Sequence, residues 1–270
     1  MTTQLRPLSG ALGAELVGVD LREPQPAEVR AAAAAALRER HLVLVRGQDI
    51  ELADQARFVS WFGSVDTSGY PPGMVDEPAM FISNTRPEGV ARNGLLLKHQ
   101  DHCFFDRVLP AICLYAEETP DDGGDTIFAN AELAFERLPA PLRARIASLS
   151  ARHVYDYASD YGTVRFRIAT SPDAPRAEHP VAWPHPRSGR TVLFVNELMT
   201  DGIVGLPEDE SEELLATLWS YLDDPAVQHR HRWRRGDVLL WDNRSLQHGR
   251  TSFASTARRS LRRLQVELAS

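Results

Sequence analysis

The chain has 270 residues and a mass of 30.1 kDa, which is long enough to bury the core of one large domain. Its composition, 43% hydrophobic and 25% charged, is ordinary for a globular protein and excludes a disordered, collagen-like or coiled-coil chain. The formal net charge of −7 provides no positive surface for nucleic acid or an anionic membrane, so we expect neither as a partner.

The beginning of the chain and its two cysteines both indicate a cytoplasmic location. The first residues lack the apolar core of a signal peptide, and no stretch approaches the roughly 18 consecutive apolar residues of a membrane span. Cys103 and Cys113 form neither a disulfide framework nor a zinc-binding spacing. We therefore expect two free thiols in a reducing cytoplasm.

Hydrophobic spacing predicts many short strands with a few helices between them. In chain order we expect a helix over 27–40, a strand over 42–45, a helix over 52–62, strands over 80–82 and 111–116, a helix over 131–149, a strand over 191–195, a helix after the acidic segment 207–210, and strands over 238–241 and 261–268. This order lacks the regular strand–helix alternation of a doubly wound sheet.

These elements predict an α+β protein built around a β-sandwich or jelly roll, with residues 1–270 forming a single domain. The stretch from Tyr155 to Pro186 is polar, rich in proline and weakly periodic. Long ordered loops in small domains are usually lids or binding loops. We therefore predict a lid-like insertion at about residues 155–190.

Two separate segments contain the residues of a candidate metal site. His99 and Asp101 are two positions apart, so on a strand both side chains would point to the same face. His248 lies in the segment Trp241–Arg250, at the end of a buried strand. Two histidines and one carboxylate form a facial triad, which leaves coordination positions open and is typical of non-haem Fe(II) enzymes that bind a cosubstrate and O₂.

Arginines follow this segment at a spacing that suits anion binding. If residues 258–263 form a strand, Arg259 and Arg263 share one face, while Arg258 and Arg262 point the other way. A guanidinium pairs with a carboxylate through two hydrogen bonds, so one inward arginine could hold an acidic cosubstrate and the other an acidic substrate. A basic, solvent-exposed edge strand is the alternative interpretation of the same residues.

Several motifs together give the chain a clear resemblance to a known family. The matching segments are 10–22, Val45-Arg-Gly-Gln48, Phe62-Gly63, His99-Gln-Asp101, Gly123-Gly-Asp-Thr-Ile-Phe-Ala-Asn130, His179-Pro-Val181, Leu193-Phe-Val-Asn196, Trp241-Asp-Asn243, His248 and the pair Arg259 and Arg263. In this order they resemble the TauD/TfdA family of Fe(II)- and 2-oxoglutarate-dependent dioxygenases, whose members attack taurine, alkyl sulfates and phenoxyalkanoate herbicides.

The resemblance implies a fold, a set of cofactors and roles for particular residues. The implied fold is a double-stranded β-helix with flanking helices, and the implied Fe(II) ligands are His99, Asp101 and His248. Thr126 and Arg259 would bind the distal carboxylate of 2-oxoglutarate, and Arg263 would contact an acidic group of the substrate. The expected reaction hydroxylates a substrate C–H bond with O₂ while 2-oxoglutarate is decarboxylated to succinate and CO₂.

The expected substrate pocket differs from a taurine site. By offset from the triad, the polar residues that face taurine in the family fall near Leu95 and Ser68. Met199 and Phe104 add apolar side chains to the predicted wall. We therefore expect a small, fairly apolar molecule with one anionic group, such as a phenoxyalkanoate, an alkyl sulfate or sulfonate, or an acid from secondary metabolism.

Other activities fit parts of the same pattern. The same residues could support desaturation or cyclisation in secondary metabolism. A metal-dependent hydrolase or a cupin-type binding protein could use the same three ligands but would have no need of Thr126 and two inward arginines. Family members often form dimers or tetramers, so the resemblance implies a homodimer or homotetramer.

Lys98 is the only lysine of the chain and directly precedes the first predicted ligand. On a strand its side chain would point to the face opposite His99, so we expect no direct catalytic role. It could instead neutralise a nearby acid or reach the mouth of the pocket.

Overall fold

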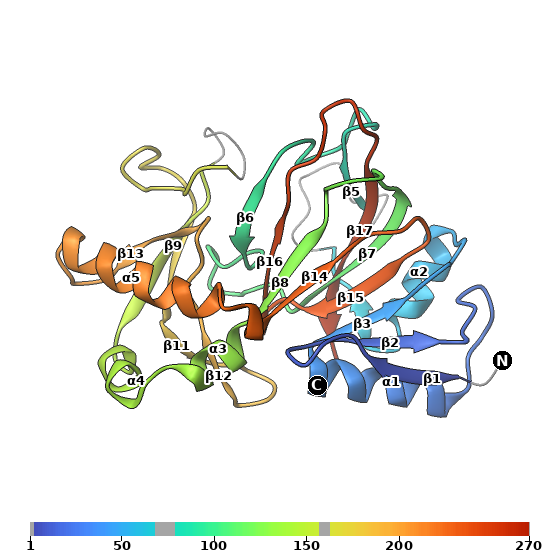
Figure 1. The fold of residues 1–270 in the computed structure, drawn as a ribbon, viewed down its shortest axis with the longest axis horizontal. Coiled ribbons are helices and arrows are strands. Elements are labelled where there is room, and N and C mark those ends of the chain that lie inside the picture. Colours follow the sequence, from blue (N-terminus) through green and yellow to red (C-terminus); the bar gives the residue numbers. More distant parts are fainter. Residues whose placement is uncertain (1–2, 68–78, 157–162, 270) are drawn as a thin grey trace.

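The computed structural model describes residues 3–67, 79–156 and 163–269. Its helices are α1 (Ala27–Arg40), α2 (Leu52–Val59), α3 (Ala131–Arg137), α4 (Ala140–Ile146), α5 (Glu208–Leu222) and the short 3-10 helix η1 (Pro225–Val227). None of these helices is long and apolar enough to cross a membrane. Figure 1 shows the helices on the two outer sides of a β structure that occupies the middle of the molecule.

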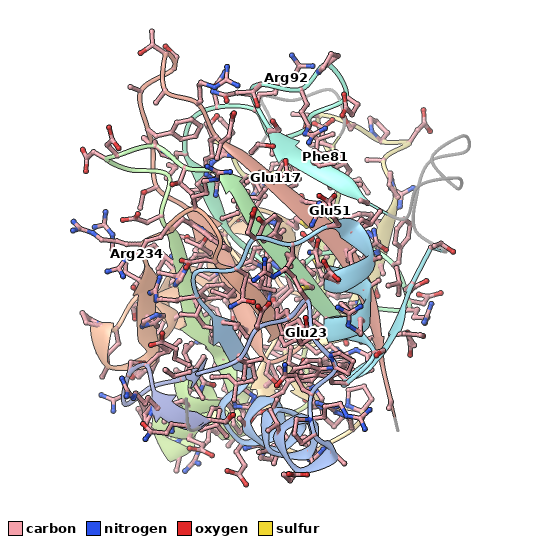
Figure 2. All side chains as sticks on the ribbon, turned by 90° about the vertical axis from the view of Figure 1, so that its right-hand side faces the viewer. Glu23, Glu51, Phe81, Arg92, Glu117 and Arg234 are labelled. Atoms are coloured by element: carbon pink, nitrogen blue, oxygen red, sulfur yellow. The ribbon has the colours of Figure 1, made fainter. Side chains whose placement is uncertain are left out.

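A large sheet forms one half of this β structure. Its strands, in spatial order, are β1 (Gln4–Pro7), β2 (Ala14–Val17), β3 (Leu42–Val45), β15 (Val238–Asp242), β7 (Ala111–Glu118), β17 (Ser260–Leu268) and β4 (Gly63–Val65), and β5 (Met80–Ser83) also pairs with β17. Helices α1 and α2 cover its outer face, where Leu37 and Phe58 pack against sheet residues such as Val43 and Leu264. Figure 2 views this side, with Glu51 at the start of α2 labelled.

A smaller antiparallel sheet faces the inner side of the large one. It consists of β14 (Gln228–His231), β8 (Thr126–Asn130), β16 (Leu246–Arg250) and β6 (Leu96–His99), in that spatial order. Leu44 and Ile112 of the large sheet share a buried cluster with Phe128 and Leu246 of the small one. The Phe128 ring packs edge-on against Trp241, with ring centroids 5.3 Å apart. This shared core holds the two sheets face to face.

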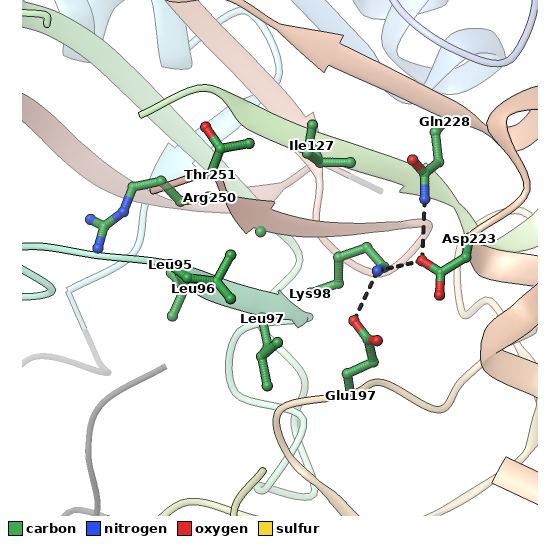
Figure 3. Close-up of a pocket in the computed structure, with 11 residues that line it drawn as sticks. Leu95, Leu96, Leu97, Lys98, Ile127, Glu197, Asp223, Gln228, Arg250 and Thr251 are labelled. Carbon is green, nitrogen blue, oxygen red and sulfur yellow. Dashed lines mark hydrogen bonds and ion pairs between the residues drawn. The ribbon is translucent and has the colours of Figure 1, made fainter. Parts of the chain in front are cut away.

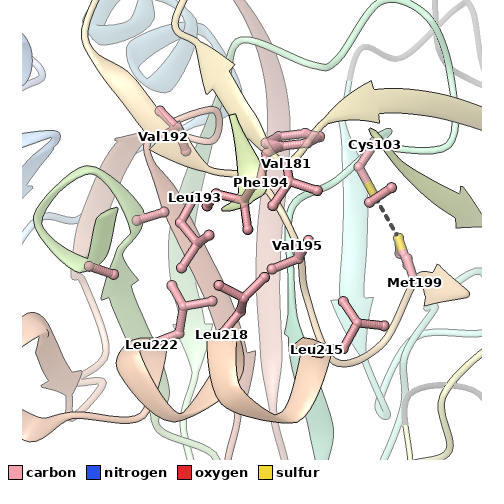
Figure 4. Close-up of a cluster of buried hydrophobic side chains, with 14 of the residues drawn as sticks. Cys103, Val181, Val192, Leu193, Phe194, Val195, Met199, Leu215, Leu218 and Leu222 are labelled. Atoms are coloured by element: carbon pink, nitrogen blue, oxygen red, sulfur yellow. Dashed lines mark hydrogen bonds between the residues drawn. The ribbon is translucent and has the colours of Figure 1, made fainter. Parts of the chain in front are cut away.

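A third layer covers the outer face of the small sheet. It contains a sheet of β10 (Arg176–Pro180), β9 (Ser150–Val154) and β13 (Thr200–Ile203), the pair β11 (Ala182–Pro184) and β12 (Thr191–Leu193), and the helices α3 and α5. Figure 4 shows Leu215, Leu218 and Leu222 of α5 directed at the segment from Val192 to Val195. The predicted α+β class is confirmed, because strands and helices both contribute to this core.

The prediction of one continuous helix over 131–149 is wrong, because the helix is interrupted in the middle. The chain forms α3 and α4 instead, and Leu138 between them has an extended backbone with φ −63° and ψ 137°. Pro139 explains the break, because proline disfavours the helical conformation in the residue before it. The helix expected over 52–62 ends at Val59, and the strand expected over 191–195 ends at Leu193.

The stretch expected to be one long loop contains two strands, while its role as a lid stays a prediction. Residues 157–162 lie outside the described residues, but β10 and β11 fall within the segment that was expected to be one long loop. Ala177 and His179 of β10 are buried between exposed neighbours, which is the alternation of a half-buried strand. The strand pattern is weak in the sequence because the buried alanine and histidine differ little in hydrophobicity from their exposed neighbours.

Candidate metal and cosubstrate site

The structure brings together His99, Asp101 and His248 on the inner side of the small sheet. His99 is the last residue of β6, and the antiparallel register places His248 of β16 directly opposite it. One possible ligand atom from each of the three side chains lies within 4.8 Å of the others. Asp101 Oδ1 is 3.1 Å from His99 Nε2 and 3.8 Å from His248 Nε2.

The alternation of a strand is not what places Asp101 next to His99. Strand β6 ends at His99, and Asp101 belongs to the turn that follows. The side chain of Asn243 holds this turn, since its Oδ1 accepts from Asp101 N at 2.9 Å and its Nδ2 donates to Asp101 O at 3.0 Å. Asn243 directly follows β15, so the large sheet positions a residue at the end of the small one.

The protonation states of these side chains suit a divalent cation. Burial lowers the pKa of His248 to about 3, so its imidazole is neutral at pH 7. Burial alone would raise the pKa of Asp101, but the charge of Arg263 holds it well below its usual range. His99 Nδ1 lies 2.8 Å from Leu97 O, and a proton on Nδ1 would leave Nε2 free as a donor to metal.

This donor set fits a transition metal of the kind predicted. Two neutral imidazoles and one carboxylate are the ligands of a facial Fe(II) site. In the described part of the chain, the buried His248 Nδ1 has no hydrogen-bond partner. Asp101 has one oxygen near the imidazoles and the other, Oδ2, 2.8 Å from Arg263 Nη2. One carboxylate oxygen is therefore available to a metal while the other is held in place.

The residues predicted to bind 2-oxoglutarate lie at the start of β8 and just before β17. Arg259 is 3% exposed, and among the described residues its Nη1 has no partner, while its Nε donates to Gly124 O at 3.3 Å. Burial and the nearby charge of Arg250 lower the pKa of Arg259 to about 9, so it remains cationic at pH 7. A buried cation with an unused N–H is a site for an anion.

Gly123 and Gly124 make room for this arginine. Both have positive φ, +74° and +65°, which glycine adopts readily. A Cβ at Gly124 would lie 3.1 Å from Arg259 Nε, and one at Gly123 would lie 2.3 Å from Ser252 O. Close packing on Arg259 therefore requires Gly124, and close packing on the backbone at Ser252 requires Gly123.

Arg263 lies on β17 and is 4% exposed. It was predicted to contact an acidic substrate, and the structure pairs it with the Asp101 carboxylate. Its other terminal nitrogen, Nη1, lies 3.9 Å from Met80 Sδ. Arg263 is therefore adjacent to the candidate metal ligands, with one side of its guanidinium already engaged.

The predicted substrate-wall residues occupy different environments. Met199 and Phe104 are 2% and 5% exposed and belong to the core of the third layer, where Met199 Sδ lies 3.4 Å from Cys103 Sγ. Both side chains are therefore almost fully buried, and their contact with substrate stays a prediction. Leu95 is 40% exposed, and Ser68 lies outside the described residues.

Leu95 lines a cavity of about 280 Å³ on the outer face of the small sheet. Figure 3 shows Lys98 in this cavity, with Nζ 2.8 Å from Glu197 Oε2 and 2.7 Å from Asp223 Oδ1. Lys98 thus neutralises two acids, while His99, the next residue of β6, faces the other side of the sheet. This cavity is separate from the candidate metal site.

Two residues of the site received no role from the sequence. Asn243 was noted as part of a motif, but its bonds to Asp101 were not anticipated. Trp233 Nε1 donates to Thr126 Oγ1 at 2.9 Å, although the two residues are 107 positions apart. A tryptophan near the end of a strand gives no sequence signal that separates this contact from ordinary core packing.

Comparison with known proteins identifies the class. The family model described as "Taurine catabolism dioxygenase TauD, TfdA family" matches residues 4–265. The chain belongs to this family, so the expected enzyme class, a 2-oxoglutarate-dependent dioxygenase, is confirmed, and the hydrolase and cupin-type alternatives are not supported.

Individual relatives and solved structures agree with this assignment. The chain is 32% identical over 272 residues to the alpha-ketoglutarate-dependent sulfate ester dioxygenase of Pseudomonas putida, covering 97% of this chain and 88% of the relative. It is 31% identical to pentalenolactone F synthase of Streptomyces avermitilis, covering 94% of this chain and 90% of that protein. The crystal structure of a taurine dioxygenase from Burkholderia xenovorans aligns with a TM-score of 0.80 and 31% identity, over 99% of this chain and 91% of that one.

Proposed function

We propose that this protein is an Fe(II)- and 2-oxoglutarate-dependent dioxygenase that hydroxylates a C–H bond of a small, fairly apolar acid. The observation that carries the proposal is the cluster of His99, Asp101 and His248, together with the buried and incompletely paired Arg259. We further infer that the two facing sheets form one double-stranded β-helix domain. The cytoplasmic location and the homodimer or homotetramer expected from the sequence stay part of the proposal.

In this proposal each group has one task. His99, Asp101 and His248 hold Fe(II), which supplies activation of O₂ coupled to decarboxylation of 2-oxoglutarate. One oxygen atom of O₂ enters succinate and the other enters the substrate as a hydroxyl group, with release of CO₂. Arg259 and Thr126 bind the distal carboxylate and so fix the orientation of the cosubstrate.

The substrate is proposed to be an anion that meets Arg263. The guanidinium uses one nitrogen for Asp101, which leaves the rest of its donors for an acidic group beside the metal. The apolar contacts of the substrate stay a prediction from the sequence, because Leu95 lines the cavity on the other face of the small sheet. The Pseudomonas putida relative is named for sulfate esters, which are small anions of this kind.

Two experiments test the proposal. Anaerobic addition of 2-oxoglutarate to the Fe(II) protein should produce the visible charge-transfer band of a chelated cosubstrate, and an Arg259→Met variant should require much more 2-oxoglutarate. Succinate release should then be measured with phenoxyalkanoates, alkyl sulfates and alkyl sulfonates. Absence of the band would overturn the cofactor assignment, and strong coupling to taurine or to cationic substrates alone would overturn the substrate class.

A second outcome of the same chemistry, desaturation or cyclisation, shares every residue named. The mass of the product separates the two reactions. A gain of one oxygen atom identifies hydroxylation, whereas a loss of two hydrogen atoms identifies desaturation or ring closure.

A further inference from the structure

A buried hydrogen bond between Trp233 and Thr126 lies beside the proposed cosubstrate site, and only one of the two residues can be its donor. Trp233 Nε1 and Thr126 Oγ1 are 2.9 Å apart, and the two residues are 7% and 5% exposed. An indole N–H can only donate, so the threonine oxygen is the acceptor. The hydroxyl proton of Thr126 is therefore left to donate elsewhere, and within residues 3–67, 79–156 and 163–269 the structure gives it no acceptor.

Neighbouring side chains also fix the position of the Trp233 ring. His231 of β14 lies opposite Thr126 in the strand register, and its ring packs edge-on against Trp233 at 4.6 Å between centroids. His231 Nε2 lies 3.1 Å from Asp237 Oδ2, and this oxygen accepts a hydrogen bond from Arg46 Nη1 at 2.7 Å. This series of contacts leaves the indole N–H little freedom to turn away from Thr126.

The carboxylate next to Thr126, that of Asp125, is paired with Arg230, whose Nε donates to Asp125 Oδ2 at 2.6 Å. Arg259, whose Nε bonds to Gly124 O two residues before Thr126, has an unused N–H. The guanidinium groups of Arg250 and Arg259 both lie near the Phe253 ring, 5.3 Å and 5.9 Å from its centroid. A carboxylate accepts hydrogen bonds but donates none, so it requires Thr126 as a donor and not as an acceptor.

We propose that Trp233 is a positioning residue for the cosubstrate, because it orients the Thr126 hydroxyl as a hydrogen-bond donor to the distal carboxylate. This inference rests on the proposed function. Trp233 does not touch 2-oxoglutarate itself; it acts through Thr126. Without the indole N–H, the hydroxyl can rotate to other orientations, so part of the binding free energy is lost to ordering it again.

The test compares Trp233→Phe with wild type and with a matched control, Trp61→Phe, which removes an indole that packs on Phe58 on the far side of the large sheet. The dissociation constant of 2-oxoglutarate is measured by calorimetry on the manganese-loaded protein under anaerobic conditions. We expect a rise of about three- to tenfold for Trp233→Phe, the effect of one neutral hydrogen bond, and no change for Trp61→Phe. In turnover with iron, KM for 2-oxoglutarate should rise by more than kcat falls.

A double-mutant cycle separates positioning from general packing. In a Thr126→Val background, which has no hydroxyl to orient, Trp233→Phe should cause no further loss of affinity. Trp233→Met removes the same donor with a flexible side chain and serves as the second variant if Trp233→Phe does not fold. An unchanged dissociation constant in the folded variant, or an equal loss in the Thr126→Val background, would overturn the inference. If wild type itself does not bind 2-oxoglutarate, the proposed function fails first.

Discussion

Buried arginines lie on both faces of β17, but they differ in how many of their N–H groups have a hydrogen-bond partner in the protein. On the face toward α2, each nitrogen of the Arg262 guanidinium has a protein partner: Nε donates to Gln55 Oε1 at 2.8 Å, Nη2 donates to Ile50 O at 3.0 Å, and Nη1 lies 3.6 Å from Glu117 Oε1. On the opposite face, Arg263 contacts the Asp101 carboxylate at 2.8 Å, and Arg259, just before the strand, keeps an unused and buried N–H.

This difference teaches how to separate structural from functional arginines in a fold of this kind. A buried guanidinium whose donors are all paired within the protein fixes the position of neighbouring elements, here α2 against the large sheet. A buried guanidinium with an unused donor is costly unless an anion completes it. The comparison therefore predicts opposite effects of the same substitution on stability and on binding.

Replacing Arg259 by methionine should give the largest effect. We expect the affinity for 2-oxoglutarate to fall at least about 100-fold, because a buried charge-assisted pair is lost. The variant should unfold at the same or a higher temperature than wild type when no cosubstrate is present, because a buried and unpaired charge has been removed. Calorimetry and thermal denaturation check the two halves, and a clear loss of stability in the absence of cosubstrate would contradict the comparison.

Arg262→Met, the matched substitution on the other face, should show the reverse pattern. It leaves Gln55 Oε1 and Ile50 O without their donors, so we expect the free energy of unfolding to fall by about 2–4 kcal/mol. The dissociation constant of 2-oxoglutarate should stay within about twofold of the wild-type value, because a substitution that shares no contact with the binding site has little effect on affinity there. Urea denaturation measures the first quantity, and a stability equal to that of wild type would show that Arg262 is not the anchor of α2.

Arg263→Gln should have an intermediate effect, on metal binding. The substitution weakens the hold on Asp101 Oδ2, and loss of a residue that supports a metal ligand typically costs 10- to 100-fold in affinity. We expect the dissociation constant of Mn²⁺ to rise by about tenfold, and the metal-free protein to melt at a lower temperature because Asp101 loses its charge partner. Titration followed by electron paramagnetic resonance provides the measurement. Unchanged Mn²⁺ affinity would limit Arg263 to a role in substrate binding.

The sequence predicted the two faces of this strand because alternation along β17 depends only on local backbone geometry. It also predicted that His99, Asp101 and His248 converge, although Asn243 and not strand alternation places Asp101. Leu95 was placed at the substrate pocket by its offset from the triad, but an offset does not tell which face of the small sheet a side chain occupies, and Leu95 lines a cavity on the outer face.

The contacts that escaped prediction are single polar bonds between distant parts of the chain. The bond from Trp233 to Thr126 joins residues 107 positions apart, and the bonds from Asn243 to Asp101 join residues 142 apart. Such contacts have no periodic pattern, because they depend on how two sheets pack and not on the conformation of either segment alone. Strand β10 was not predicted for a related reason, since it becomes a strand only by pairing with β9.

Arg258 should give the smallest effect and sets the baseline of the comparison. It lies beside Arg259 but is exposed, and its Nη2 donates to Glu118 Oε1 at 2.7 Å in full contact with solvent. Ion pairs of this kind add little to stability, because water and salt screen both partners. Arg258→Gln should therefore leave the melting temperature, the metal affinity and the 2-oxoglutarate affinity unchanged. A loss of cosubstrate affinity in this variant would mean that overall positive charge, and not the unused N–H of Arg259, attracts the anion.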